Sequence, residues 1–277
     1  MNEFEENRLS RDDRERDIGA GHPFKLSLKD RLLMLLMYYR LYVSSNLVGF
    51  LFDLDHSNVI RDIHYLEPAL KGCGIPIPQK IYERATRAST PEEVEEYFPG
   101  FKALIDATEQ EIPRPTDKEK RKTHYSGKKK MHSVKTQLAV NSNGLIVHKT
   151  NHARGRRHDL DIYVGHHPNL PHEVEQNFDR GYDGIRNYFP DLNCITPFKK
   201  RSTGRGHKGE KAEDLTPEQK MFNKRLAKVR VVVEHTISRL KKFNIFGNEF
   251  RNRLRHYDVM TDIIFGLVNL RIIGTSI

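Results

Sequence analysis

Apolar residues between positions 25 and 70 recur every three to four residues, which predicts three helices. The first begins near Ser27, a suitable N-cap with Asp30 three residues later. A second helix is expected over 46–52, and a third from about residue 57 to residue 70, after the turn "DLDHS". A longer helix followed by two helices around a tight turn is typical of a helix-turn-helix domain.

The third of these helices is expected to present polar side chains outward. They are Asn58, Arg61, Asp62 and His64 or Tyr65. A packing or dimerisation role for such a small helical domain is an open alternative. The basic character of the whole chain favours DNA binding instead, with Asn58 and Arg61 as contact residues.

After Pro99 the pattern changes to alternating strands and helices. "FKALIDATEQEI" predicts a strand, and "MHSVKTQLAVN" with "LIVHKTNHA" predicts a hairpin around Ser142, Asn143 and Gly144. A helix is expected from Asp159, followed by short strands at "VEQNF" and "NCITPF". A long helix over 216–243 and an amphipathic helix over 256–273 complete the pattern. It predicts an α/β domain, with a mixed central sheet flanked by helices.

Changes in composition suggest four segments. Residues 1–24 are polar and are expected to form a disordered tail, and residues 25–72 form the helical domain. Residues 73–100 begin with the Gly/Pro-rich "KGCGIPIPQKI" and are predicted to be a linker that includes a short acidic helix. Residues 101–277 form the α/β domain.

The charge of the chain favours an anionic partner. The 277 residues carry a net charge of +10, and the sequence pI is about 9.5. Two blocks hold the excess: nine Lys/Arg against two acids over 114–135, and eleven against four over 199–230. Such local patches favour nucleic acid as the partner.

The two cysteines, Cys73 and Cys194, form no CxxC pair, so a reducing interior is expected. The charged N-terminal residues do not resemble a signal peptide, and the run "RLLMLLMYYRLYV" is too short to span a bilayer. We therefore expect a soluble protein with no membrane partner. It would be cytoplasmic and associated with the nucleoid in a bacterium or archaeon, and nuclear in a eukaryote.

Three acids stand in unusual local settings. Asp106 lies within an apolar strand, where a charge is costly unless it is paired or bound to metal. Asp179 follows a strand and precedes Gly181, and Glu234 lies on a cationic helix. Three carboxylates brought together repel one another and favour divalent cations. Two Mg²⁺ ions held in this way can catalyse chemistry at a phosphodiester.

The stretch "RVVVEHTISRLK" places Arg230, Glu234 and Lys241 near one face of the long helix. In an arbitrary sequence, this stripe would be a salt-bridged surface. Four motifs in order favour a functional site instead: "IDATEQEIPRP", "KTHYSGKKKMHSVKTQ", "FDRGYDG" and the R-x3-E-x6-K pattern of this stretch. Together they resemble transposases of the DDE superfamily, in the branch of insertion-sequence family five and the Harbinger-like endonucleases.

The resemblance covers nearly the whole chain and implies an RNase H-like catalytic domain behind a helix-turn-helix domain. It implies that Asp106, Asp179 and Glu234 bind two Mg²⁺ ions, with Mn²⁺ as an alternative. Arg230 and Lys241 are expected to contact DNA phosphate or orient Glu234.

The implied activity is cut-and-paste transposition. The protein would bind terminal inverted repeats of double-stranded DNA, cleave the ends and join the 3′-hydroxyls to target DNA. Paired end cleavage implies a homodimer or a higher oligomer. Two alternatives stay open: a domesticated, non-catalytic DNA-binding regulator, and a plain RNase H-like nuclease.

Weaker signals concern the basic loops and one further acid. Lys128, Lys129 and Lys130, next to Tyr125 and Gly127, favour DNA backbone contact over a merely solvated run. "GRGHKGEK", from residue 204, is expected to be a basic loop near DNA. For Asp159, a helix-capping role is at least as well supported as a role in the site.

Overall fold

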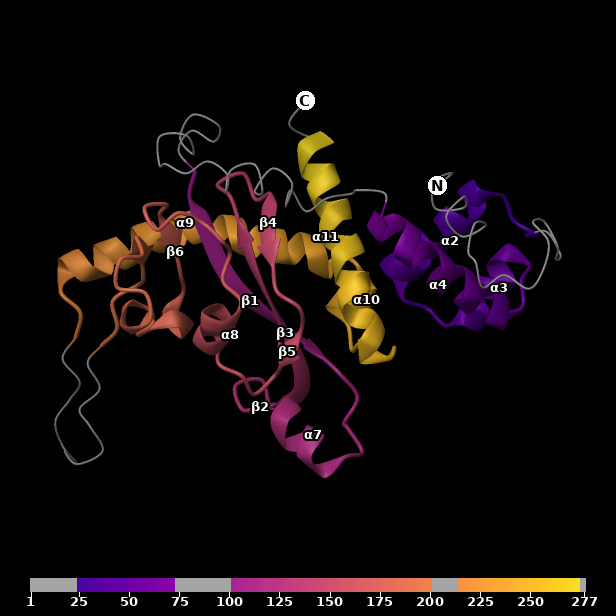
Figure 1. The fold of residues 1–277 in the computed structure, drawn as a ribbon, viewed down its shortest axis with the longest axis horizontal. Helices are drawn as coiled ribbons and strands as arrows, with labels where there is room; N and C mark the ends of the chain where they lie inside the picture. The colour runs from indigo at the N-terminus through magenta and orange to yellow at the C-terminus, as the bar shows by residue number, and fades with distance from the viewer. Residues whose placement is uncertain (1–23, 73–100, 201–213, 275–277) are drawn as a thin grey trace, which may run out of the picture.

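A computed structural model describes residues 24–72, 101–200 and 214–274. The predicted linker at 73–100, the loop from residue 204 and all of the predicted tail except Phe24 lie outside the described residues. Two regions are apparent in Figure 1, a small helical one and a larger one built on a sheet. None of the described helices is both long and apolar enough to cross a membrane.

The helical region has the three predicted helices: α2 (Leu28–Leu41), α3 (Ser45–Phe52) and α4 (His56–Gly72). Ser27 caps α2 by accepting the N–H of Asp30, and Ser44 caps α3 by accepting that of Leu47. Tyr42 and Asp53 end α2 and α3 in the left-handed conformation, each with φ 51°. These caps and turns fold α3 and α4 into the predicted tight pair.

One predicted surface residue of α4 is buried. Asn58, Arg61 and His64 are exposed and Tyr65 is partly buried, but Asp62 is only 7% exposed. Its Oδ1 lies 2.9 Å from Nη2 of Arg31 on α2, which is itself 4% exposed. The expectation that Asp62 faces outward is therefore wrong, because a buried guanidinium on the neighbouring helix requires a counter-charge.

The larger region is built on a mixed sheet with the strand order β2-β3-β1-β6-β7. The predicted strand is β1 (Ala103–Glu111), and the predicted hairpin is β3 (Met131–Val140) with β4 (Ile146–Lys149). These three strands pair antiparallel, whereas β1, β6 and β7 pair parallel. The remaining strands are short: β2 (Tyr125–Ser126), β5 (Ala153–Arg154), β6 (Gln176–Asn177) and β7 (Cys194–Ile195).

Helices cover both faces of the sheet (Figure 1). On one face, α9 (Pro217–Lys241) and α11 (Tyr257–Gly274) form a core with Leu104 and Leu138 that continues into α2 and α4. On the other, α8 (Asp159–Gly165) packs with Ala103 and Ile105. The other helical segments are α7 (Lys118–His124), α10 (Asn244–Gly247) and 3-10 turns at Arg180–Tyr182, Ile185–Asn187 and Leu254–His256.

This arrangement confirms the predicted fold class, a helix-turn-helix region followed by a mixed α/β domain consistent with the RNase H-like fold. Two details differ from the prediction. The basic run before β2 contains the helix α7, and α11 is buried on most sides rather than amphipathic. Because α11 packs against both α4 and α9, it has little surface left to expose.

Candidate functional site

Asp106 lies in the middle of β1, where successive side chains face opposite sides of the sheet. It therefore shares the face of Leu104, which packs toward α9. Its Oδ2 lies 3.4 Å from Nη2 of Arg230 on that helix, and its Oδ1 accepts the N–H of Ala107 at 2.9 Å. Arg230 and Asp106 thus come together although 124 residues of sequence separate them (230 − 106).

The pKa of Asp106 is raised to about 6, chiefly because burial disfavours its charged form. Arg230 opposes this rise, whereas the nearby carboxylates of Asp179 and Asp159 add to it. The pKa of Asp106 is raised even though Arg230 lies beside it, so burial and repulsion between the carboxylates outweigh the effect of this one cation. A further positive charge near Asp106 would therefore stabilise its charged form.

Asp179 lies two residues beyond β6 and caps the 3-10 turn at Arg180–Tyr182, accepting the N–H of Gly181. Gly181 separates two carboxylates: a Cβ at this position would come within 2.8 Å of Asp179 Oδ1 and 3.1 Å of Asp159 Oδ2. A side chain there would push one of these acids aside. The glycine therefore allows the close approach of Asp179 and Asp159.

Glu234 is exposed on α9, one turn after Arg230, where the buried Val233 and Thr236 fix the rotation of the helix. Asp106, Asp179 and Glu234 all line one open cleft of about 850 Å³ between β1, α9 and the Asp179 turn. A strand centre, a strand end and a facing helix supply the three acids, as the sequence predicted.

Asp159 is the acid whose role in the site the sequence left open. It is the first residue of α8, but it lines the same cleft. Its Oδ1 accepts a hydrogen bond from Nζ of Lys135 at 2.8 Å, and Lys135 also lies 3.6 Å from Oε1 of Glu109. The sequence does contain one signal for this contact. Lys135 is a charged residue within a buried strand, and a buried charge requires a partner of opposite charge.

The predicted cations divide between the cleft and its surroundings. Lys128, Lys129 and Lys241 line the cleft with Arg230, whereas Lys130 is exposed in the adjoining turn and is not among the lining residues. The pKa of Lys241 is lowered, first by burial and then by Lys129. The cleft therefore carries charges of both signs, with the acids on its floor.

Asn58 and Arg61 lie elsewhere, on the exposed face of α4, and neither lines the acid cleft. Nη1 of Arg61 donates to Oδ1 of Asn58 at 2.7 Å, so the two side chains form one polar group. Any DNA contact they make is separate from chemistry at the acids.

Residues 105–269, more than half of the chain, match a family described as DDE superfamily endonuclease. The chain belongs to this superfamily. Residues 24–75 match the helix-turn-helix of DDE superfamily endonucleases, so both regions of this DDE protein point to DNA as its partner.

A relative supports the same assignment. The chain is 29% identical over 252 residues to a protein of Microchaete diplosiphon named "Probable transposase for insertion sequence element IS702", covering 90% of this chain and 82% of the relative. No solved structure matches the chain significantly. The narrower branch suggested by the sequence stays a prediction.

The DDE superfamily generally uses divalent metal ions, and this DDE protein offers the oxygen ligands that Mg²⁺ prefers. The acids of the cleft are not drawn tightly together. Within the described residues, the three metal-ligating side chains whose ligand atoms all lie within 4.8 Å of one another are His64, Glu67 and His256.

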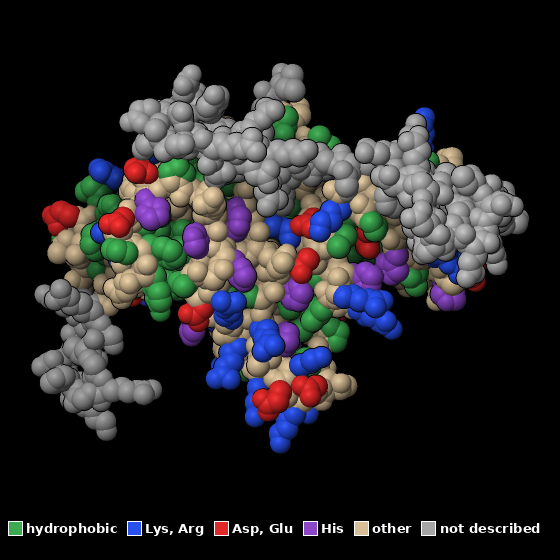
Figure 2. Space-filling view, in the orientation of Figure 1, with side chains coloured by type: hydrophobic (Ala, Val, Ile, Leu, Met, Phe, Trp, Pro, Cys, Tyr) green, Lys and Arg blue, Asp and Glu red, His purple; other side chains and the backbone are tan. Residues whose placement is uncertain are grey.

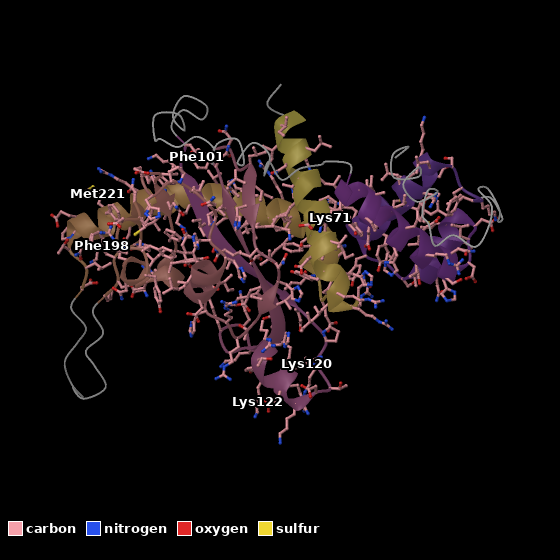
Figure 3. The ribbon with its side chains drawn as sticks, viewed as in Figure 1. Lys71, Phe101, Lys120, Lys122, Phe198 and Met221 are labelled. Atoms are coloured by element: carbon pink, nitrogen blue, oxygen red, sulfur yellow. The ribbon has the colours of Figure 1, made fainter. Side chains whose placement is uncertain are left out.

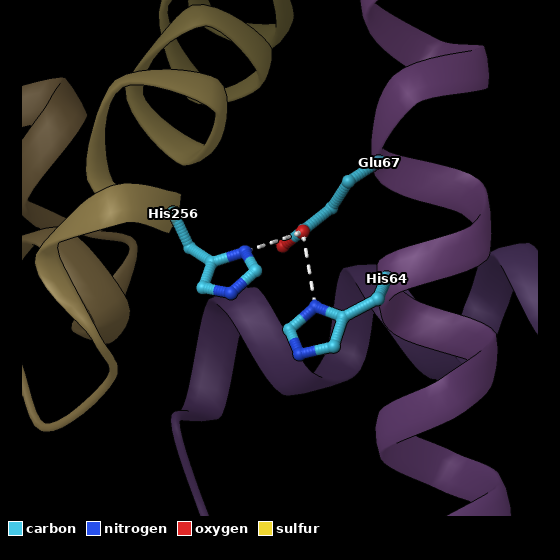
Figure 4. A group of neighbouring side chains, drawn as sticks. All are labelled: His64, Glu67 and His256. Carbon is cyan, nitrogen blue, oxygen red and sulfur yellow. Dashed lines mark hydrogen bonds and ion pairs between the residues drawn. The ribbon is translucent and has the colours of Figure 1, made fainter.

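That second group joins α4 to the Leu254–His256 turn, away from the cleft (Figure 4). Oε2 of the buried Glu67 lies 3.3 Å from Nδ1 of His64 and 3.8 Å from Nδ1 of His256, and its Oε1 accepts the hydroxyl of Tyr39 at 2.7 Å. Nε of Arg255 donates to Nε2 of His256 at 3.0 Å, which leaves the proton of a neutral His256 on Nδ1, facing Glu67. Hydrogen bonds of Glu67 to His64 and Tyr39, together with the stacking of the His64 and His256 rings at 4.3 Å, account for this group as a contact between the two regions.

Proposed function

We propose that this chain is a DNA transposase whose acid cleft cleaves the ends of a mobile element and joins them to target DNA. The observation that carries the proposal is the convergence of Asp106, Asp179 and Glu234 on one cleft in a chain of the DDE superfamily. The raised pKa of Asp106, caused by burial and then by its neighbours, supports a site built to receive positive charge.

The three carboxylates fit a pair of Mg²⁺ ions, with Mn²⁺ as an alternative. Ions about 4 Å apart are held from several sides, so their ligands need not lie within one coordination sphere. When bound, such ions activate the attacking hydroxyl and stabilise the leaving oxygen of a phosphodiester. Asp159 extends the acid set beyond the three residues, with Lys135 holding its carboxylate in place.

The cations of the cleft orient the substrate. Arg230 lies beside Asp106 in the cleft, and Lys241 lies farther along the same helix, so both can meet phosphate oxygens of a strand lying on the acids. Lys128 and Lys129, on the turn before β3, also line the cleft. No protein nucleophile is needed, because water and then the DNA 3′-hydroxyl attack in turn.

The helix-turn-helix would recognise the terminal inverted repeats. The exposed Asn58 and Arg61 lie near the start of α4, the second helix of the tight pair, and this is the helix that enters the major groove in such domains. Their mutual hydrogen bond would be exchanged for contacts to base edges. Paired cleavage of two ends implies a homodimer or a higher oligomer, acting wherever the host keeps its DNA.

The test is a strand-transfer assay with Mg²⁺ on DNA carrying the element ends. Asp106→Asn should bind these ends with unchanged affinity but neither cleave nor join them. Asp161→Asn, the same exchange at an exposed position of α8, should behave as wild type. Cleavage by Asp106→Asn would refute the assigned site.

The assay also separates the two alternatives. Wild-type protein that binds the ends without cleaving them would be a DNA-binding regulator. Protein that cleaves DNA without joining the ends, whatever the sequence, would be a plain nuclease.

A further inference from the structure

A second hollow, of about 1040 Å³, adjoins the acid cleft and shares Lys128 and Asp159 with it. It lies between α7, the turn before β3 and the loop that precedes α8. We call it the basic groove. Six of its lining residues form two groups of cations, Arg114, Lys118, Arg121 and Lys122 around α7, and Arg156 and Arg157 on the loop.

Positive charge dominates the groove. Asp159, at its border with the acid cleft, is the single carboxylate among the described lining residues. Figure 2 shows Lys and Arg side chains gathered over the end of the molecule where α7 lies, and Figure 3 places Lys120 and Lys122 there. This concentration makes the groove a surface for an anionic polymer rather than for a small neutral ligand.

The loop that carries Arg156 is held rigidly. Gly155 donates its N–H to the carbonyl of Ser133 at 2.9 Å, and Arg156 donates its N–H to that of Thr123 at 3.2 Å. A Cβ on Gly155 would lie 2.2 Å from Oγ of Ser133, so the loop touches the sheet directly. The backbone of Arg156 is therefore fixed against both β3 and the end of α7.

The groove and the acid cleft are also fixed to each other. Nζ of the buried Lys135 donates to the carbonyl of Arg157 and to Oδ1 of Asp159, each at 2.8 Å. One side chain thus connects the basic loop to an acid of the cleft. A strand bound in the groove would be held in register with the acids.

Most of the six groove cations form no salt bridge among the described residues, so they are available to bind an external anion. Within the described parts of the chain, Lys122 alone of the six forms a salt bridge, with Glu119. Nε of Arg121 is buried and has no hydrogen-bond partner among the described residues. No side-chain hydrogen bond of Arg121 to another described residue is present, so the N–H groups of its guanidinium that line the groove are available to phosphate oxygens.

We propose that the basic groove binds the sugar-phosphate backbone of the DNA next to the bond held in the acid cleft. The inference rests on the proposed function, because that function supplies the scissile bond. Along each strand of duplex DNA, phosphates recur every 3.4 Å of axis, so a strand crossing the cleft presents several of them to the adjoining groove. The contacts are to the backbone and position the DNA without reading its sequence.

The experiment compares two charge-matched double variants of the full chain. Arg121→Ala with Arg156→Ala removes two groove cations. The control variant, Lys102→Ala with Arg186→Ala, removes two exposed cations that line neither hollow and lie outside both basic blocks. Lys102 follows Phe101, which lies at a different end of the molecule from Lys122 in Figure 3. Binding of duplex DNA carrying the element ends is measured by fluorescence anisotropy in EDTA over a range of salt concentrations.

The groove variant should lower the slope of log K against log salt by about 1.8, because each lost phosphate contact contributes about 0.9. The control variant should keep the wild-type slope. Equal slopes for both variants would overturn the proposal. Since EDTA excludes metal-dependent cleavage, this outcome does not depend on whether the acids catalyse.

A second measurement locates the contact. Neutral methylphosphonates placed beside the cleavage position should weaken binding by wild type but not by the groove variant. Equal weakening for both proteins would place the contact elsewhere. If the groove variant behaves as predicted but wild-type protein never cleaves DNA, the proposed DNA contact at the basic groove is supported and the proposed transposase function is refuted.

Discussion

The buried pair between Arg31 and Asp62 leads to a sharp prediction about the helix-turn-helix. Asp62→Ala leaves the Arg31 guanidinium, which is 4% exposed, without its counter-charge. Nε of Arg31 already lacks a hydrogen-bond partner among the described residues, so the loss of Asp62 would leave a second part of this buried guanidinium without an acceptor. Removing one partner of a buried ion pair costs about 3–5 kcal/mol, so the free energy of unfolding should fall by about that amount.

The assay is urea denaturation followed by circular dichroism. Arg31→Met combined with Asp62→Leu should recover most of the loss, because an apolar pair of similar size leaves no buried charge. Asp183→Ala serves as the control, since Asp183 pairs with Lys199 on the surface, and its unfolding curve should match that of wild type. A loss below about 1 kcal/mol for Asp62→Ala would refute the burial argument and return Asp62 to the DNA-facing surface of α4.

Three further predictions concern the larger domain. Gly181→Ala should reduce DNA cleavage about 10-fold while leaving end binding intact in gel-shift assays, because its Cβ would displace an acid of the cleft by a fraction of an ångström. Lys135→Met should lower the free energy of unfolding in urea by about 3 kcal/mol, because Asp159 loses its 2.8 Å partner; unchanged stability would contradict this. Burial tends to raise the pKa of Asp258, but hydrogen bonds from His152 lower it overall. The resulting stability is present above the unfolded pKa of about 3.9 and is lost as pH falls through the lower folded value, so wild type should lose more stability than His152→Ala on acidification.

Local signals in the sequence predicted most of the elements. Ser27 and Thr216 are caps whose side chains accept the N–H three residues later, which is a property of neighbouring residues alone. Gly144, with φ 82°, turns the hairpin as expected. The apolar neighbours of Asp106 indicated that its charge needs a partner or a metal, whereas its proposed role as a metal ligand came from the resemblance to DDE transposases.

Features that depend on distant contacts could not be predicted in this way. Asp62 appeared to be a surface residue of α4 because nothing near it in sequence reveals Arg31, a partner on another helix. For Asp159, helix capping was as well supported as a role in the site because Asp is a favoured N-cap residue, but in the structure His158 is the N-cap of α8 and Asp159 is its first residue. Only the fold brings Lys135 and Asp179 beside it.

The proposed function explains why Glu234 lies in a cationic helix, because a cleft that binds both metal and DNA needs charges of both signs. Arg230 lies 3.4 Å from Asp106, and the pKa of Asp106 is still raised by its burial. One guanidinium therefore does not balance the acids, and further positive charge is favoured there. Bound DNA phosphate would add negative charge to the same cleft, and cations would be needed to stabilise it. Arg230 and Lys241 line the cleft with Glu234, so under the proposed function α9 would supply cations for the phosphate and a carboxylate for the metal on one rigid support.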